Sequence, residues 1–428
     1  MIFIIGVAFF ALAKKFRDKL HTWNNPGALF LLLWGSIFVG YSFRLFNIYS
    51  TDWYIILVFI LGIISFSIGA YPKLYKLGKT TFEKDYEKSV EHFKIENSKR
   101  YIFLALSIIA TVILIIRDIY ILPFWSGGVS MVKWANIEGI IEYPRILQLL
   151  YSFYAYPIEI VSVFIMAIYL FFNKDFLGKI QIAVSMIMIL ASYIGSGSKF
   201  SLFIPILSVM VVHNIYNNIH IFNMKKEQMG ILKKLLLVVL VVFVIISILY
   251  LLNQKSGGWI KNLYFYFVGC IPFGGYTINS TYGKSYYYGM VSLNGVFRMI
   301  ALICSVFGIG MPYAGIMNKA YAEMQSFQKA IYITPTVKYN AFSTMFAYFY
   351  RDGGLIAVIV FSLILGLICK NVYNRLKKES SGYSLIMYLF IIYIILFGIV
   401  RIQTFLLQTI PIIIYIKVLF QERRFSKK

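Results

Sequence analysis

Charged residues, and acidic ones above all, are scarce in this chain. Asp, Glu, Lys and Arg make up 14% of its 428 residues, whereas a soluble globular domain carries roughly 25%. Only 17 residues are Asp or Glu, against 41 Lys and Arg, which gives a formal net charge of +24. No polar block long enough for a soluble domain interrupts the apolar runs. The composition excludes a soluble protein and predicts a single membrane domain over residues 1–428.

The chain also lacks the motifs of nucleotide-dependent and metal-dependent enzymes. Residues 195–199 (Gly-Ser-Gly-Ser-Lys) have no Gly-Lys-Ser/Thr core and follow a predicted membrane helix, so they do not predict a phosphate loop. His213 and His220 have no third ligand at metal spacing. The cysteines form no CxxC pair, so we expect isolated thiols, with a Cys270–Cys304 disulfide as the alternative. We therefore expect no cofactor and no metal.

Apolar runs long enough to cross a bilayer recur along the sequence, since a spanning helix needs about 20 residues. They predict an all-α, polytopic membrane protein of about eleven transmembrane helices. Eight precede residue 253, a long loop covers 253–352, and three helices and a basic tail occupy 353–428. The predicted spans lie near 1–13, 27–43, 53–71, 101–122, 147–172, 180–197, 200–218, 235–252, 353–370, 383–400 and 402–419.

Lys and Arg are concentrated in alternate loops, as the positive-inside rule requires of cytoplasmic ones. This pattern predicts an outside N-terminus, a cytoplasmic C-terminus and an external loop at 253–352. The apolar stretch 289–310, with Arg298 at its centre, would place the basic 370–378 loop outside if it crossed the membrane. We therefore expect 289–310 to be re-entrant or interfacial.

The 253–352 loop is rich in basic residues on the side that should be poor in them. Runs of Tyr and Phe accompany these charges at 264–267, 286–288 and 348–350. Interfacial belts explain most such rings, but the same rings also stack on sugar faces. A cationic, aromatic surface at the outer leaflet fits an anionic, sugar-bearing lipid headgroup better than a nucleic acid. The loop thus predicts a site for a polyprenyl diphosphate glycolipid.

Several charged residues lie in or near the predicted helices, where a central charge costs roughly 2.5–3.5 kcal/mol. Arg117 and Asp118 form either a self-neutralising pair or a functional one. Glu159 has no obvious partner and is either a buried acid or half of a structural ion pair. Arg401 either snorkels or joins Lys199 and Arg351 as a third cation at one membrane face, where the three can clamp a diphosphate.

The segment 339–354, Tyr-Asn-Ala-Phe-Ser-Thr-Met-Phe-Ala-Tyr-Phe-Tyr-Arg-Asp-Gly-Gly, resembles a segment of Wzy-type oligosaccharide repeat unit polymerases. In that family an Asn and a Thr precede a short aromatic stretch, and an Asp-aromatic-Gly turn leads into a Gly-containing helix. Gly353 here replaces the aromatic residue. Residues 196–199 occupy the place of the family's Gly-x-Arg, with Lys199 instead of Arg. The helix number and the long late loop match over the whole chain.

This resemblance implies a metal-independent, GT-C-like membrane glycosyltransferase at the outer face of the bacterial plasma membrane. Such an enzyme joins undecaprenyl-diphosphate-linked repeat units into an O-antigen, capsule or exopolysaccharide. Its partners would be the polyprenyl-diphosphate-linked oligosaccharide, the lipid bilayer, a flippase and a chain-length regulator. Prepositioned cations would stabilise the leaving diphosphate. The cations expected to bind it are Lys199, Arg298, Arg351 and Arg401.

A base for the acceptor hydroxyl is expected among the carboxylates, with Asp352 as the first choice and Glu323 as the second. Asp352 has an alternative role as a helix cap or as the partner of Arg351. The further candidates are Arg117, Asp118 and Glu159. Three other classes stay open: a lipid-linked oligosaccharide flippase, an O-antigen ligase that uses a different acceptor, and a non-catalytic membrane scaffold.

Overall fold

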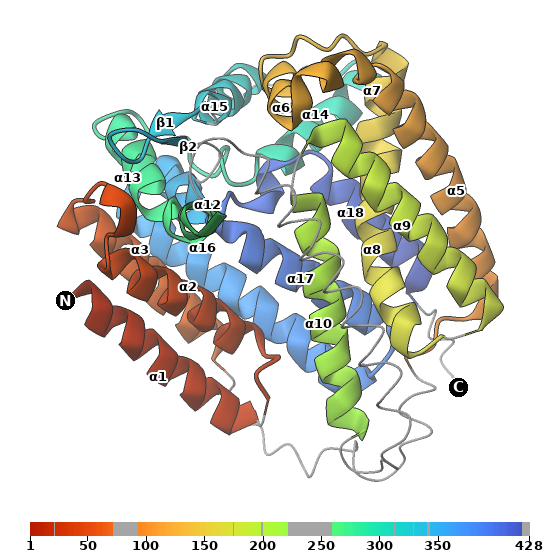
Figure 1. Ribbon diagram of the computed structural model, residues 1–428, viewed down its shortest axis with the longest axis horizontal. Helices are drawn as coiled ribbons and strands as arrows, with labels where there is room; N and C mark the ends of the chain where they lie inside the picture. The colour runs from red at the N-terminus through yellow and green to blue at the C-terminus, as the bar shows by residue number, and fades with distance from the viewer. Residues whose placement is uncertain are drawn as a thin grey trace.

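The computed structural model describes residues 1–20, 22–71, 93–173, 175–197, 200–220, 259–311, 313–327, 329–339 and 343–421. This part is helical apart from one hairpin and the connecting loops (Figure 1). The α-helices are α1 (Ile2–Leu20), α2 (Pro26–Ser42), α3 (Trp53–Ala70), α5 (Asn97–Ile119), α6 (Gly128–Ile137), α7 (Arg145–Leu150), α8 (Tyr156–Phe171), α9 (Phe176–Ser196), α10 (Phe200–His220), α12 (Trp259–Val268), α13 (Cys270–Thr281), α14 (Asn294–Val306), α15 (Ala314–Ser326), α16 (Thr344–Glu379), α17 (Gly382–Leu396) and α18 (Thr409–Phe420).

Short helical turns and one hairpin complete the fold. The hairpin pairs β1 (Ile331–Tyr332) antiparallel with β2 (Lys338–Tyr339), in the register Ile331 to Tyr339. One short element is a π-helix, η4 (Tyr151–Ala155), which joins α7 to α8. The others are 3₁₀ turns: η1 (Leu45–Asn47), η3 (Leu122–Gly127), η5 (Phe397–Ile399) and η6 (Gln403–Phe405).

Six of the described helical segments are long and apolar enough to cross a membrane, which indicates a multi-pass membrane protein. They are Trp53–Ala70, Asn97–Ile119, Arg145–Phe171, Phe176–Ser196, Thr344–Glu379 and Gly382–Ile399. Each predicted span that falls on described residues coincides with a helix, but the predicted count of eleven crossings is not confirmed. The last span is shorter than predicted because residues 402–408 form the loop around η6, which leaves α18 only 12 residues. The predicted span 235–252 lies outside the described residues.

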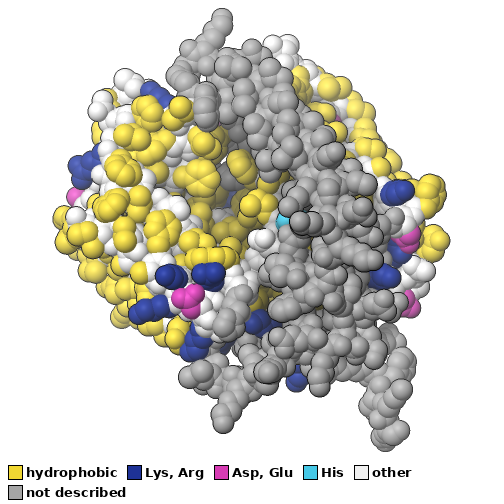
Figure 2. Space-filling model, turned by 60° about the horizontal axis from the view of Figure 1, so that its bottom comes forward, with side chains coloured by type: hydrophobic (Ala, Val, Ile, Leu, Met, Phe, Trp, Pro, Cys, Tyr) yellow, Lys and Arg dark blue, Asp and Glu magenta, His cyan; other side chains and the backbone are white. Residues whose placement is uncertain are grey.

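The described surface is largely apolar. Figure 2 shows hydrophobic side chains over most of the described face in that view, with Lys and Arg in small groups. On α5, one side of the helix carries a row of exposed aliphatic residues: Ile108, Ile109, Val112, Ile115 and Ile116. An exposed apolar row of this length is typical of a lipid-facing helix.

An aromatic cluster fills the core between α2, α3 and the first turns of α16. The Phe346 ring lies 5.0 Å from that of Trp34 and 5.7 Å from that of Phe59, centroid to centroid. Burial of this cluster extends α16 to Thr344, nine residues before the start predicted at 353. The segment 344–352 is therefore a buried helical stretch, which the bend at Gly353 and Gly354 separates from the rest of α16 close to the predicted start.

Close contact between two glycines lets α3 and α16 cross tightly. A Cβ atom added at Gly69 would lie 2.2 Å from the Leu363 carbonyl oxygen, and one added at Gly366 would lie 2.2 Å from the Phe66 carbonyl oxygen. Backbones that approach this closely are typical of small-residue interfaces between membrane helices.

We expect Gly366→Leu to lower the stability of the folded protein by about 1–3 kcal/mol, because the side chain would push α16 off α3. Thermal unfolding in detergent would measure the loss as a lower midpoint. Val360→Leu, at an exposed position of the same helix, is the control and should leave the midpoint unchanged. Equal midpoints for the two variants would show that the crossing adapts without cost.

Helices α6, α7 and α12–α15 gather with the hairpin at one end of the bundle, which we call the cap end (Figure 1). The hairpin is tied there to the α2–α3 loop, because the Tyr49 amide donates to the Ile333 carbonyl. Helix α14 spans only 13 residues, about 20 Å at 1.5 Å per residue, which is less than a bilayer core. The structure thus forms no full crossing within 289–310.

Candidate functional site

Two of the predicted site residues, Glu323 and Arg351, form a compact group with Lys284 and Tyr287 at the cap end. We call these four residues the Arg351 cluster. The Arg351 guanidinium donates to both Glu323 oxygens, Nε at 2.8 Å and Nη2 at 2.9 Å. It also donates to the Ser285 carbonyl and lies 4.3 Å from the centre of the Tyr287 ring. Arg351 is therefore neutralised and only 3% exposed.

Glu323 is held as an ionised carboxylate. Partial burial alone would raise its pKa, but hydrogen bonds from Arg351 and Tyr287 outweigh burial and hold the pKa of Glu323 below its usual value. Burial, together with the bond that it donates to Glu323, raises the pKa of the Tyr287 hydroxyl. A carboxylate that already accepts three hydrogen bonds is a poor base.

Asp352 lies beside this cluster but makes different bonds. Its two carboxylate oxygens accept the backbone N–H groups of Val291 and Ser292, each at 2.8 Å, in the turn that leads into α14. At Gly353 and Gly354 the helix bends, with Gly354 at a φ of +64°. The backbone N–H groups of Tyr287 and Tyr288 donate to the carbonyls of Arg351 and Asp352 just before the bend. Asp352 thus fastens the 287–292 segment to α16.

Arg298 also supports structure through an aromatic contact. Its guanidinium lies 4.2 Å from the centre of the Tyr321 ring on α15. Tyr321 stacks on Phe405 of η6, with 5.4 Å between the ring centroids. Thr404 donates to the Ser292 carbonyl. Helices α14 and α15 therefore rest on the loop that follows Arg401.

The remaining candidates converge on a second place, a cavity of about 200 Å³ between α8, α9, α10 and the α17–α18 connection. We call it the polar cavity because most of the side chains that line it carry hydroxyl, amide or charged groups. Its polar lining residues are Tyr151, Tyr156, Glu159, Ser192, Ser196, Ser201, Tyr393, Arg401 and Gln403.

Glu159 supplies the negative charge of the polar cavity. It is 3% exposed, and its Oε2 accepts no hydrogen bond from any described residue. The Ser192 hydroxyl of α9 is close enough to interact with the carboxyl group. Glu159 lies in the first turn of α8, directly after the π-helical η4, an element that is frequent at functional sites.

Arg401 supplies a positive charge to the same cavity. It lies between η5 and η6, and its Nε is buried without a hydrogen-bond partner among the described residues. Tyr156 and Tyr393 interact electrostatically with both Arg401 and Glu159. The two tyrosine hydroxyls are 3.4 Å apart, and Tyr393 donates to Gln403 Oε1 at 3.0 Å. The two charges therefore face one cavity without pairing.

Arg117 and Asp118 lie next to the polar cavity at the end of α5. The Arg117 guanidinium is 4.0 Å from the centre of the Tyr151 ring, and it interacts electrostatically with Glu159. Asp118 packs against Gly195, where a Cβ atom would lie 2.3 Å from its Oδ1. Within the described part of the chain the two side chains form no salt bridge with each other, although both reach Gly195 and interact electrostatically.

The comparisons with known proteins add no family. No protein-family model, curated protein or solved structure matches this chain. The function of the site is therefore inferred from its geometry alone.

The structure thus separates the predicted site residues into two groups. Arg351, Glu323 and Asp352 hold the cap end, whereas Glu159 and Arg401 share the polar cavity. Lys199 lies outside the described residues. Sequence reasoning missed Tyr393 and Gln403. The only signal in the sequence was that Gln403 is a polar residue after a long apolar run. Cys270, Cys304 and Cys369 are free thiols, so the alternative of a Cys270–Cys304 disulfide is not formed here.

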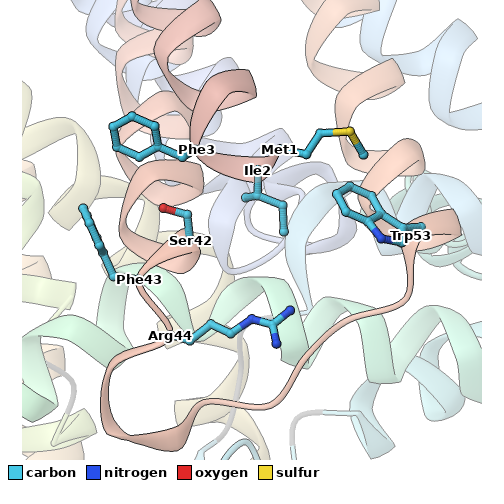
Figure 3. Close-up of a pocket in the computed structure, with 7 residues that line it drawn as sticks. All are labelled: Met1, Ile2, Phe3, Ser42, Phe43, Arg44 and Trp53. Atoms are coloured by element: carbon cyan, nitrogen blue, oxygen red, sulfur yellow. The ribbon is translucent and has the colours of Figure 1, made fainter.

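A more open hollow of about 410 Å³ lies at the other side of the cap end (Figure 3). It is lined by the first residues of α1, by the end of α2 and by Trp53, and the Arg44 side chain reaches into it. No carboxylate is among its lining residues. The hollow therefore offers the Arg44 guanidinium and mostly apolar walls, without a carboxylate.

Proposed function

We propose that this protein polymerises undecaprenyl-diphosphate-linked oligosaccharide repeat units into a surface polysaccharide, and that the reaction takes place in the polar cavity. The observation that supports the proposal most is that Arg401 and Glu159 line one cavity without an ion pair between them, and that each has a buried atom, Nε and Oε2, that makes no hydrogen bond with a described residue. Burying a polar atom without a hydrogen bond is costly. A ligand that carries both a phosphate and a hydroxyl group would satisfy the two side chains at once.

Arg401 suits the diphosphate. When the growing glycan leaves its lipid carrier, negative charge develops on the departing diphosphate, and a preorganised guanidinium stabilises that charge more than it stabilises the ground state. Arg117, which interacts electrostatically with Glu159 and Tyr151, is a second cation next to the cavity. Lys199, four residues beyond Gly195 in the sequence, is proposed as a third on the basis of the resemblance alone.

The Arg351 cluster and Asp352 have a supporting role in this proposal. Their polar atoms are bonded within the protein, so they hold α15 and the 287–292 segment on α16, next to the polar cavity's loop at η6 that the 287–292 segment and α15 also contact. Arg298 contributes through Tyr321 in the same way. The sugar rings are proposed to contact the tyrosines between Glu159 and Arg401, since amphipathic rings both stack on sugars and donate hydrogen bonds.

The proposal is tested with purified protein, lipid-linked repeat units and a metal chelator. We expect a ladder of lipid-linked products without nucleotide sugars, because nothing in the proposed mechanism uses them. Strict dependence on a nucleotide sugar or a divalent metal would overturn it. Transfer only to a different acceptor would indicate a ligase instead, and movement of the lipid across vesicles without chain growth would indicate a flippase.

A further inference from the structure

The polymerisation proposed above requires a group that accepts the proton of the acceptor hydroxyl. Asp352 does not fit this role, because both of its oxygens accept backbone N–H groups. Glu323 does not fit it either, because Arg351 and Tyr287 occupy its oxygens. Both were the carboxylates favoured by sequence, and both are used to hold the fold.

Glu159 differs from them in geometry. It is the carboxylate among the residues that line the polar cavity, it is almost fully buried, and one of its oxygens has no described donor. Charged and polar groups from several elements lie near the Glu159 carboxylate. Helix α5 contributes Arg117 and Asp118, α9 contributes Ser192, and α17 contributes Tyr393. Tyr151 of η4 and Tyr156 of α8 are also close, and Arg401 lines the same cavity. A hydroxyl group that enters the cavity would complete the hydrogen bonding of Oε2.

We propose that Glu159 is the general base of the reaction, and that it takes its proton from the acceptor sugar hydroxyl. This inference rests on the proposed function. The acceptor oxygen forms a bond to the anomeric carbon of the growing glycan. The bond between that carbon and the diphosphate oxygen breaks, and its electron pair stays on the diphosphate, which Arg401 stabilises. The hydroxyl proton passes to the Glu159 carboxylate, which releases it to water before the next turnover.

The two charges then have separate tasks in one cavity. A base that was paired with Arg401 would be less basic and would also neutralise the cation that the diphosphate needs. Tyr156 and Tyr393 each interact electrostatically with both side chains. The absence of a Glu159–Arg401 ion pair, which looks costly for stability, is what the chemistry requires.

The decisive variant is Glu159→Gln, which keeps the size and polarity of the side chain but cannot accept a proton. We expect its rate of polymerisation to fall about 100-fold or more, in line with the usual contribution of a general base. Protection against thermal unfolding by the lipid-linked repeat unit should persist, because Arg401 and the tyrosines are intact. Wild-type rate should rise with pH as the carboxylate ionises, and the residual rate of Glu159→Gln should lack that rise.

Glu142→Gln is the matched control, since Glu142 is an exposed carboxylate of the α6–α7 connection, and it should polymerise at the wild-type rate. If Glu159→Gln fails to fold, Glu159→Asp serves instead, and a lowered rate with the pH dependence retained is expected. A normal rate in a folded Glu159→Gln protein would overturn the inference while leaving the proposed function intact. No polymerisation by the wild-type protein would overturn the proposed function itself.

Discussion

Replacing Arg401 by methionine is expected to lower the rate of polymerisation about 100-fold or more, with the protein still folded. The guanidinium makes no hydrogen bond to any described residue, so its removal should cost little stability. Each charge-assisted bond to the departing diphosphate contributes about 1.5–3 kcal/mol, and loss of even one or two gives this reduction. Ladder growth by purified protein, corrected for the amount of folded enzyme, is the measurement.

Two controls sharpen this prediction. Arg401→Lys keeps the charge without the planar fork and should retain more activity than Arg401→Met. Arg44→Met removes an arginine from the other hollow at the cap end and should polymerise normally. Normal chain growth in Arg401→Met would remove Arg401 from the site, and an equal loss in Arg44→Met would show that general surface charge is responsible.

Replacing Arg351 by methionine is expected to have its largest effect on stability, with a loss of about 3–5 kcal/mol. The change would leave the partly buried Glu323 with only the exposed Lys284, at 4.0 Å, as a cation, and a broken buried ion pair costs about this much. Equilibrium unfolding in detergent measures the loss. The double variant Arg351→Met with Glu323→Leu should recover much of it, because no unpaired charge is left behind.

Acid offers an independent check on the same pair. The folded-state pKa of Glu323 lies below its usual value. The pair therefore stabilises the fold fully above the usual pKa of a glutamate, and this stabilisation is lost as the pH falls through the lower, folded-state pKa. Acidification should thus lower the unfolding midpoint of the wild-type protein more than that of the double variant. Identical acid sensitivity would contradict the ion pair.

Most of the helices could be predicted because the length of each apolar run can be read directly from the sequence. The start of α16 could not, because the aromatic residues of 344–352 are equally compatible with an interfacial loop and a buried helix. Only the packing of Phe346 against Trp34 and Phe59 decides between them. The same holds for the loop at 402–408, whose mixed sequence, Ile-Gln-Thr-Phe-Leu-Leu-Gln, does not reveal that the last helix begins only at Thr409.

The candidate site was predicted less well, because the sequence does not show which charged side chains form ion pairs in the folded protein. Sequence placed Arg351, Arg401 and Glu323 together because they belong to the same predicted membrane face. A shared face does not reveal which charges neutralise each other: Arg351 meets Glu323 across 28 residues of chain, whereas Arg401 meets no carboxylate among the described residues. Glu159 was noted for lacking an obvious partner, and in the structure its Oε2 accepts no hydrogen bond from a described residue.

The bend at Gly353 and Gly354 has a consequence for how this protein can vary. Residues 285–292 are fastened to α16 mainly through their own main chain: the Ser285 carbonyl, and the amides of Tyr287, Tyr288, Val291 and Ser292. Main-chain groups are the same whatever side chain they carry. The main-chain bonds therefore hold the segment in place whatever side chains it carries, and only a few of its residues are constrained in themselves. Tyr287 bonds to Glu323, Tyr286 packs against Gly354, Gly289 has a φ of +92°, and Val291 is fully buried. The position of the segment is set mainly by Arg351, Asp352 and the two glycines that follow them.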